Sequence, residues 1–157
     1  MITINTAHAH CDIPCKVYDP SVIQYSALSI VRFMDLIADE IKNSDMSVSK
    51  ISQLARLTAV KEEHAKEVKN EVATIWGDYF KEPQISKYPE IHELTHSIMQ
   101  LASKCKQHIN RDDGVKLLEE INKFTEIFWE TKNIKTGRYY APYPPELVIV
   151  CPVLKNA

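Results

Sequence analysis

Four stretches of this sequence place apolar residues three and four positions apart, the spacing that lines one face of an α-helix. The first follows Asp19-Pro20, an N-cap acceptor and a proline in the first turn. The second runs from Ile51 to near Gly77, the third opens at Pro89, and Asp112 or Asp113 is expected to cap the fourth. Four amphipathic helices with short connections predict an all-α fold, an antiparallel four-helix bundle.

Composition narrows the class of protein. The chain has 157 residues, of which 45% are hydrophobic and 25% charged, as expected for one globular domain with its own core. With 19 basic and 21 acidic residues, its net charge of −2 predicts no basic surface for nucleic acid. The continuous apolar runs are shorter than a membrane span, so no membrane partner is expected. Three glycines exclude a glycine-rich phosphate loop.

Two segments depart from the helical pattern. Glu82-Pro83 predicts a loop between the second and third helices. After Lys132 the prolines of Tyr139–Pro145 prevent a helix, and Leu147–Cys151 has the composition of a strand. Because one strand alone forms no sheet, residues 133–157 are predicted to be an extended C-terminal arm on the bundle or on a neighbouring subunit.

The segment ahead of the first helix carries a metal-donor set. His10, Cys11 and Cys15 supply one imidazole and two thiols, one side chain fewer than zinc usually takes. A cut between Ala9 and His10 would add a free amine and the Cys11 amide. Two nitrogens and two sulfurs in a plane, with an axial imidazole, suit nickel or copper. From spacing alone, a flexible N-terminus with incidental thiols stays open as the alternative.

Longer motifs connect the chain to a known family. The string His-Cys-Asp-x-Pro-Cys-x-Val-Tyr-Asp-Pro, residues 10–20, resembles the nickel hook of the nickel superoxide dismutases. Trp76–Pro83, Lys87–Leu94 and Ile127–Lys132 resemble further segments of that family, in the same order. The resemblance covers residues 10–132. It divides the chain into a leader (1–9), a hook (10–18), a helical bundle (19–132) and a C-terminal tail (133–157).

The resemblance implies an enzyme that disproportionates superoxide to O2 and H2O2 while nickel alternates between Ni(III) and Ni(II). It implies one nickel ion per subunit, a homohexamer, and a maturation peptidase that removes residues 1–9. The implied nickel ligands are His10, Cys11 and Cys15. The absence of a signal-peptide pattern in residues 1–9 predicts a cytoplasmic protein.

The resemblance also implies residues around the nickel. Tyr18 and Tyr79 match the catalytic tyrosines near its open face, which hold water and limit approach. Asp12, Asp78 and Lys81 match residues that hydrogen-bond the hook or attach it to the bundle.

Two positions depart from that pattern. Lys16 stands where the family usually has glycine, which tolerates a left-handed backbone better than lysine does. Ser26 and His64 stand at or near the positions of a glutamate and an arginine that orient the hook imidazole in better-known members. Either Ser26 and His64 form a different pair, or the imidazole is held less firmly.

Other functions compete with the dismutase. His92-Glu93-x-x-His96 fits a zinc peptidase motif, with Glu119 or Glu120 as a third ligand. We favour the interpretation that both histidines are ordinary helix residues. A second alternative is a nickel- or copper-binding storage or chaperone protein that uses the same hook without redox cycling.

The two remaining cysteines have simpler interpretations. Cys105 lies on the apolar stripe of the third helix and is predicted to be a core residue. Cys151 lies in the tail, and a disulfide bond between the two is not expected in a reducing compartment.

Overall fold

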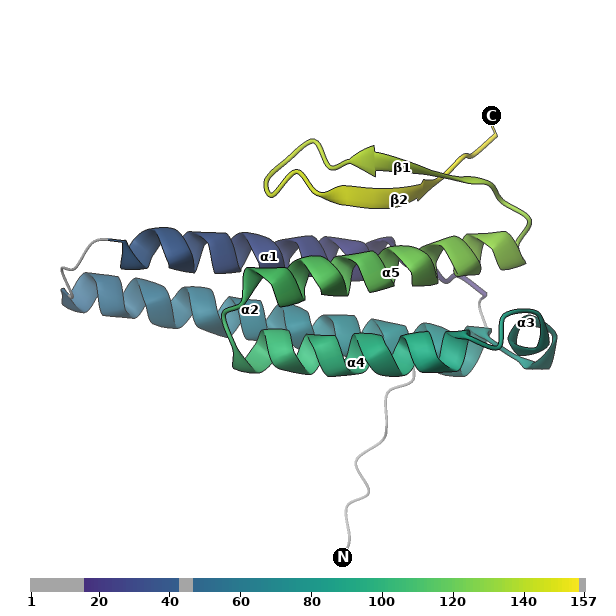
Figure 1. Cartoon of the computed structure of the whole chain (residues 1–157), viewed down its shortest axis with the longest axis horizontal. Coiled ribbons are helices and arrows are strands. Elements are labelled where there is room, and N and C mark those ends of the chain that lie inside the picture. The colour runs from purple at the N-terminus through teal and green to yellow at the C-terminus, as the bar shows by residue number, and fades with distance from the viewer. Residues whose placement is uncertain (1–15, 43–46, 156–157) are drawn as a thin grey trace, which may run out of the picture.

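Four long helices form the body of the protein. The computed structural model describes residues 16–42 and 47–155, and Figure 1 shows the helices side by side in alternating directions. They are α1 (Ser21–Ile41), α2 (Val48–Thr74), α4 (Ile91–Gln107) and α5 (Arg111–Thr131). Helix α1 packs on α2 and α5, and α4 packs on the same two helices. The predicted antiparallel four-helix bundle is therefore confirmed.

The first helix begins one residue later than predicted, and the predicted cap of the last helix differs. Pro20 is the N-cap of α1, and Asp19 Oδ1 accepts the Ser21 N–H at 2.8 Å. The predicted cap of α5 is wrong, because Asn110 is the N-cap and accepts a hydrogen bond from the Asp112 amide at 3.1 Å. Asp112 and its neighbour lie in the first turn, where negative charge stabilises the positive end of the helix dipole.

The connection from α2 to α4 is more helical than predicted. Helix α2 continues into a π-helix, η1 (Ile75–Tyr79), and after Phe80 and Lys81 the short helix α3 (Glu82–Lys87) follows. The predicted loop at Glu82-Pro83 is wrong. Proline in the first turn of a helix sacrifices no hydrogen bond, and the Gln84 side chain accepts the Lys81 amide at 3.1 Å.

The C-terminal segment is a β-hairpin rather than an extended arm. Strand β1 (Thr136–Tyr140) pairs antiparallel with β2 (Val148–Pro152), in a register that sets Thr136 opposite Pro152. The predicted strand is present, but the sequence interpretation missed its partner. The hairpin lies over the surface formed by α1 and α5 (Figure 1).

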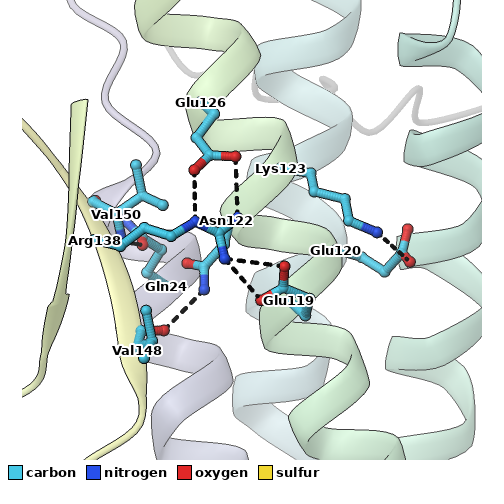
Figure 2. A network of polar contacts seen from close by, with 9 residues as sticks. All are labelled: Gln24, Glu119, Glu120, Asn122, Lys123, Glu126, Arg138, Val148 and Val150. Carbon is cyan, nitrogen blue, oxygen red and sulfur yellow. Dashed lines mark hydrogen bonds and ion pairs between the residues drawn. The ribbon is translucent and has the colours of Figure 1, made fainter. Parts of the chain in front are cut away.

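Two buried amides fasten β2 to the bundle (Figure 2). The Gln24 side chain of α1 donates to the Val150 carbonyl at 2.9 Å and accepts the Val150 amide at 2.7 Å. Asn122 of α5 donates to the Val148 carbonyl at 2.8 Å. Glutamine and asparagine thus provide the pairing partners that a third strand would otherwise provide.

An ion-pair cluster fastens β1 to α5 at the surface. Figure 2 shows the Arg138 guanidinium between the carboxylates of Glu119 and Glu126, which lie about two helical turns apart on α5. It donates to Glu126 at 2.7 and 3.1 Å and to Glu119 at 3.1 and 3.2 Å. The two carboxylates raise the pKa of Arg138, so the charge persists at any ordinary pH.

One lysine lies inside the bundle. The Lys61 side chain of α2 is only 1% exposed and donates to the carbonyls of Cys105, Lys106 and His108 at the end of α4. The last carbonyls of a helix have no partners within it and form the negative end of its dipole. The Lys61 ammonium therefore caps α4, while burial lowers the pKa of Lys61.

Helix α1 is long and apolar enough to cross a membrane, judged by length and composition. The charged residues Arg32 and Asp35 interrupt the stretch, so it is not a continuous apolar run. Half of the stretch is buried inside the bundle, and Gln24 and Ser26 on it are buried with hydrogen-bond partners. The apolar character of α1 thus matches its place between α2 and α5.

Candidate metal centre

The described part of the chain begins at Lys16, inside the predicted hook (10–18) and directly after its last proposed metal ligand. His10, Cys11, Asp12 and Cys15 lie outside the described residues, as does the leader. Lys16 is exposed and has a φ of 60°, in the left-handed region. Lysine thus adopts the backbone conformation for which glycine is better suited, at a cost of about 1–2 kcal/mol.

The two predicted tyrosines lie together. Tyr18 follows Lys16 by two residues, and its ring centroid is 5.8 Å from that of Tyr79, with the planes tilted by 54°. Tyr79 is the last residue of η1, and both rings are half-buried against the core. The contact sets the last residue of the predicted hook against the end of the bundle where η1 meets α5.

Tyr79 has further neighbours, most of them at the end of α5. Its phenol lies 2.5 Å from Thr131 Oγ1, and the ammonium of Lys132 lies 4.7 Å from its ring centroid. The rings of Phe80 and Phe128 approach it at 5.3 and 4.7 Å. Thr131 and Lys132 were not among the predicted site residues, although they end a segment that resembles the nickel enzymes.

Asp78 and Lys81 lie on either side of Tyr79 in the chain, and both are exposed. The Lys81 ammonium donates to the Gly77 carbonyl at 2.7 Å, so it folds back over η1. The predicted contacts of Asp78 and Lys81 with the hook involve residues outside the described part of the chain.

Ser26 and His64 are connected by a third residue, Glu67. The Ser26 hydroxyl donates to Glu67 Oε2 at 2.5 Å, and His64 Nδ1 lies 3.2 Å from the same oxygen. Ser26 is fully buried on α1, whereas the other two lie on α2, one helical turn apart. Glu67 escaped the sequence analysis, but its position three residues after His64 on a helix is a signal of contact.

Aromatic rings hold the His64 side chain in place. The Phe33 ring stacks on it with centroids 5.8 Å apart, and Tyr25 approaches edge-on at 6.1 Å. A carboxylate only accepts hydrogen bonds, so the network assigns the proton to His64 Nδ1. In the neutral ring, Nε2 is then left as an acceptor.

The zinc-peptidase alternative receives no geometric support. Both histidines of the motif are exposed, and His92 Nδ1 accepts a hydrogen bond from Trp76 Nε1 at 3.1 Å. Glu119, one proposed third ligand, pairs with Arg138 instead. Among residues 16–42 and 47–155, no three histidine, cysteine or acidic side chains lie close enough together to hold a metal ion.

The two described cysteines are free thiols, as expected. Cys105 is buried in the core, and burial raises its pKa to about 11. Cys151 lies on β2 and is half-buried.

Fold and sequence together describe a four-helix-bundle protein with a histidine- and cysteine-bearing segment ahead of its first helix. The family model for nickel-containing superoxide dismutase matches residues 5–132. The superoxide dismutase [Ni] of Streptomyces coelicolor is 37% identical over 127 residues, 81% of this chain and 91% of that protein. The one from Streptomyces seoulensis is 36% identical over 124 residues, 79% and 88% of the two chains.

Solved structures agree. A nickel superoxide dismutase with nickel ligation of the oxidised state matches with a TM-score of 0.70 at 35% identity, over 79% of this chain and 99% of that one. The native structure of a nickel superoxide dismutase matches with a TM-score of 0.68 at 36% identity, over 78% and 99%. The chain therefore belongs to the nickel-containing superoxide dismutase family, and its activity and metal are those of a nickel superoxide dismutase. The hairpin lies outside the matched residues.

Proposed function

We propose that the nickel is held by His10, through its amine and imidazole, by Cys11, through its amide nitrogen and thiolate, and by the Cys15 thiolate. The reaction at this site is 2 O2•− + 2 H+ → O2 + H2O2. The contact between Tyr18 and Tyr79 is the observation that carries the proposal. It brings the chain three residues beyond Cys15 against a predicted site residue at the end of η1.

The donor set fits the metal. Thiolate and amidate donors are anionic and push electron density onto nickel, which makes its higher oxidation state accessible. When bound, nickel supplies the one-electron redox chemistry by alternating between Ni(III) and Ni(II). The left-handed backbone of Lys16 supports a tight turn directly after Cys15, as a short hook requires.

The protein side chains then control access and position. Tyr18 and Tyr79 restrict approach to the open face of the metal and hold water there. Asp12, Asp78 and Lys81 attach the hook to the bundle. Lys81 is already oriented toward the turn that carries Tyr79, because its ammonium binds the Gly77 carbonyl.

Ser26, Glu67 and His64 form the support for the His10 imidazole. Ser26 and His64 share one oxygen of Glu67, so a carboxylate is present although Ser26 itself cannot supply one. The buried Ser26 hydroxyl and the stacked Phe33 ring fix this network in one arrangement. Of the two alternatives for these positions, a different pair is favoured over a loosely held imidazole.

Maturation and assembly complete the proposal. A peptidase removes residues 1–9, because the His10 amine exists only after that cut. The mature subunits form a homohexamer in the cytoplasm with one nickel ion each, as the family resemblance implies.

Nickel stoichiometry tests the ligand assignment. The chain beginning at His10 is loaded with nickel, desalted and analysed for metal, beside Cys11→Ser, Cys15→Ser and the control Cys151→Ser. We expect about one nickel per chain in the parent and the control, and loss of tight binding in the two hook variants. Full nickel retention by either hook variant would contradict the assignment, and nickel without dismutation would favour a storage protein.

A further inference from the structure

We propose that Thr131 is a positioning residue for Tyr79. It fixes the Tyr79 phenol as a hydrogen-bond donor toward the bundle, so that the phenol oxygen presents lone pairs to the nickel site. The inference rests on the proposed function, because it gives Tyr79 a definite polarity at that site. It concerns only residues that the structure describes.

The direction of the hydrogen bonds follows from counting protons. Thr131 Oγ1 lies 2.6 Å from the Phe128 carbonyl oxygen and 2.5 Å from the Tyr79 phenol oxygen. A carbonyl has no proton to give, so the single hydroxyl proton of Thr131 goes to Phe128. Thr131 can then only accept from Tyr79, and the Tyr79 proton points into the bundle.

The ring of Tyr79 cannot easily turn away from this arrangement. Phe80 and Phe128 contact it edge-on and at a tilt, and the Lys132 ammonium lies over its face and over the Phe128 ring, 4.7 and 5.1 Å from the centroids. A cation over a ring is attracted by the electron-rich face of that ring. Thr131 therefore acts on a ring that its neighbours already hold.

A phenol that accepts selects a different ligand from a phenol that donates. An anion such as superoxide or azide needs a donor, whereas water can give a proton to the Tyr79 oxygen. Tyr79 thus holds a water molecule beside the nickel site and offers no hydrogen bond to a bare anion. Its phenol limits anion access while keeping a proton-bearing molecule in place.

Thr131→Val tests the hydrogen bond from the Tyr79 phenol directly, because valine keeps the side-chain shape but removes the acceptor oxygen Oγ1. Thr131→Ser keeps the hydroxyl. Thr125→Val is a matched control on the same helix, because Thr125 is fully buried and its hydroxyl has no hydrogen-bond partner within the described residues. For the first measurement, each variant is prepared as the full chain without nickel.

The first measurement is the tyrosine Raman doublet, whose intensity ratio distinguishes donating from accepting phenols. A difference spectrum against the same protein with Tyr79→Phe isolates the Tyr79 signal. We expect a strong-donor signature in the parent, Thr131→Ser and Thr125→Val, and its loss in Thr131→Val. An accepting signature in the parent, or no change in Thr131→Val, would overturn the inference. Because no nickel is present, the result does not depend on the proposed metal ligands.

The second measurement uses the chain that begins at His10, loaded with nickel and carrying the same substitutions. In Thr131→Val the phenol proton is released toward the site, so azide inhibition should become at least about threefold tighter, while Thr131→Ser and Thr125→Val keep the parent value. A merely structural role of Thr131 would lower activity without tightening azide binding, which would count against the inference. If the parent itself binds nickel but lacks dismutase activity, the proposed function fails while the Raman result stands.

Discussion

Replacing Lys61 by methionine tests the physical account of the bundle most sharply. Methionine keeps most of the apolar stem but removes an ammonium that binds three carbonyls at the end of α4. Lys106 is half-exposed and His108 exposed, so water can reach their carbonyls, whereas Cys105 is buried. A buried unsatisfied carbonyl costs about 1–3 kcal/mol, and the lost charge at the helix end adds up to about 2.

Part of that loss is returned, because a buried ammonium carries a desolvation penalty that methionine does not. We therefore expect Lys61→Met to lower the free energy of unfolding by about 2 kcal/mol, measured by urea denaturation. Lys69→Met is the control on the same helix. Its ammonium donates a hydrogen bond to Ser103 Oγ at 3.0 Å, so we expect a loss below about 1 kcal/mol. Equal losses in the two variants would refute the capping role of Lys61.

The contribution of Lys61 to stability should depend on pH in a defined direction. Burial lowers the folded-state pKa of Lys61, so between that value and the unfolded value of about 10.4 the unfolded chain binds more protons. Stability contributed by this residue then rises with pH. The free energy of unfolding of the parent, relative to that of Lys61→Met, should therefore grow as pH rises through this alkaline window. A shrinking difference would show that the hydrogen bonds to the carbonyls raise the Lys61 pKa by more than burial lowers it.

Three further predictions follow from the same structure. Lys16→Gly removes the strain of a lysine in the left-handed region, so the nickel affinity of the chain beginning at His10 should rise about fivefold, or about 1 kcal/mol. Metal competition measures this affinity, and an unchanged value would show that no strain is released. Gln24→Ala leaves the amide and carbonyl of Val150 on β2 without their partners and should lower the free energy of unfolding in urea by about 2 kcal/mol. The exposed Arg138→Ala should lower it by less than about 1 kcal/mol, and the reverse order would contradict the anchoring role of Gln24. In the nickel-loaded protein Cys151 should react with a thiol reagent well before Cys105, whose pKa is raised to about 11 by burial. Mass spectrometry of labelled peptides measures the order, and earlier labelling of Cys105 would contradict the prediction.

The helices were predictable because their signal is periodic and local. Apolar residues at helical spacing specify each buried face, and Pro20 marks the start of α1 within one residue. The cap of α5 was missed because Asn110 and Asp112 are both good N-cap residues. Only the backbone conformation distinguishes a cap from a first-turn acid.

The hairpin was missed for a different reason. Strand β1 is Thr-Gly-Arg-Tyr-Tyr, which lacks a regular alternation of apolar and polar residues. Its strand character comes from tertiary contacts, namely pairing with β2 and the clamp of Arg138 on α5. Neither contact is local in the sequence.

The candidate site also contains residues that the sequence predicts and residues that only tertiary contacts reveal. The metal donors and the tyrosines were visible as motifs because their residue types carry the chemistry. Thr131 and Glu67 were not, because threonine and glutamate are common on helices and only their neighbours in the fold indicate a role. The contacts with Tyr79 and with Ser26 supply that meaning.

The central claim is tested most directly by superoxide dismutation after nickel loading, comparing the chain that begins at His10 with the full chain that begins at Met1. We expect rapid, nickel-dependent dismutation only in the chain beginning at His10, because the full chain has an amide in place of the amine ligand. Equal activity in both chains would contradict the proposed role of the His10 amine. Nickel binding without activity in the chain beginning at His10 would contradict the proposed catalytic site.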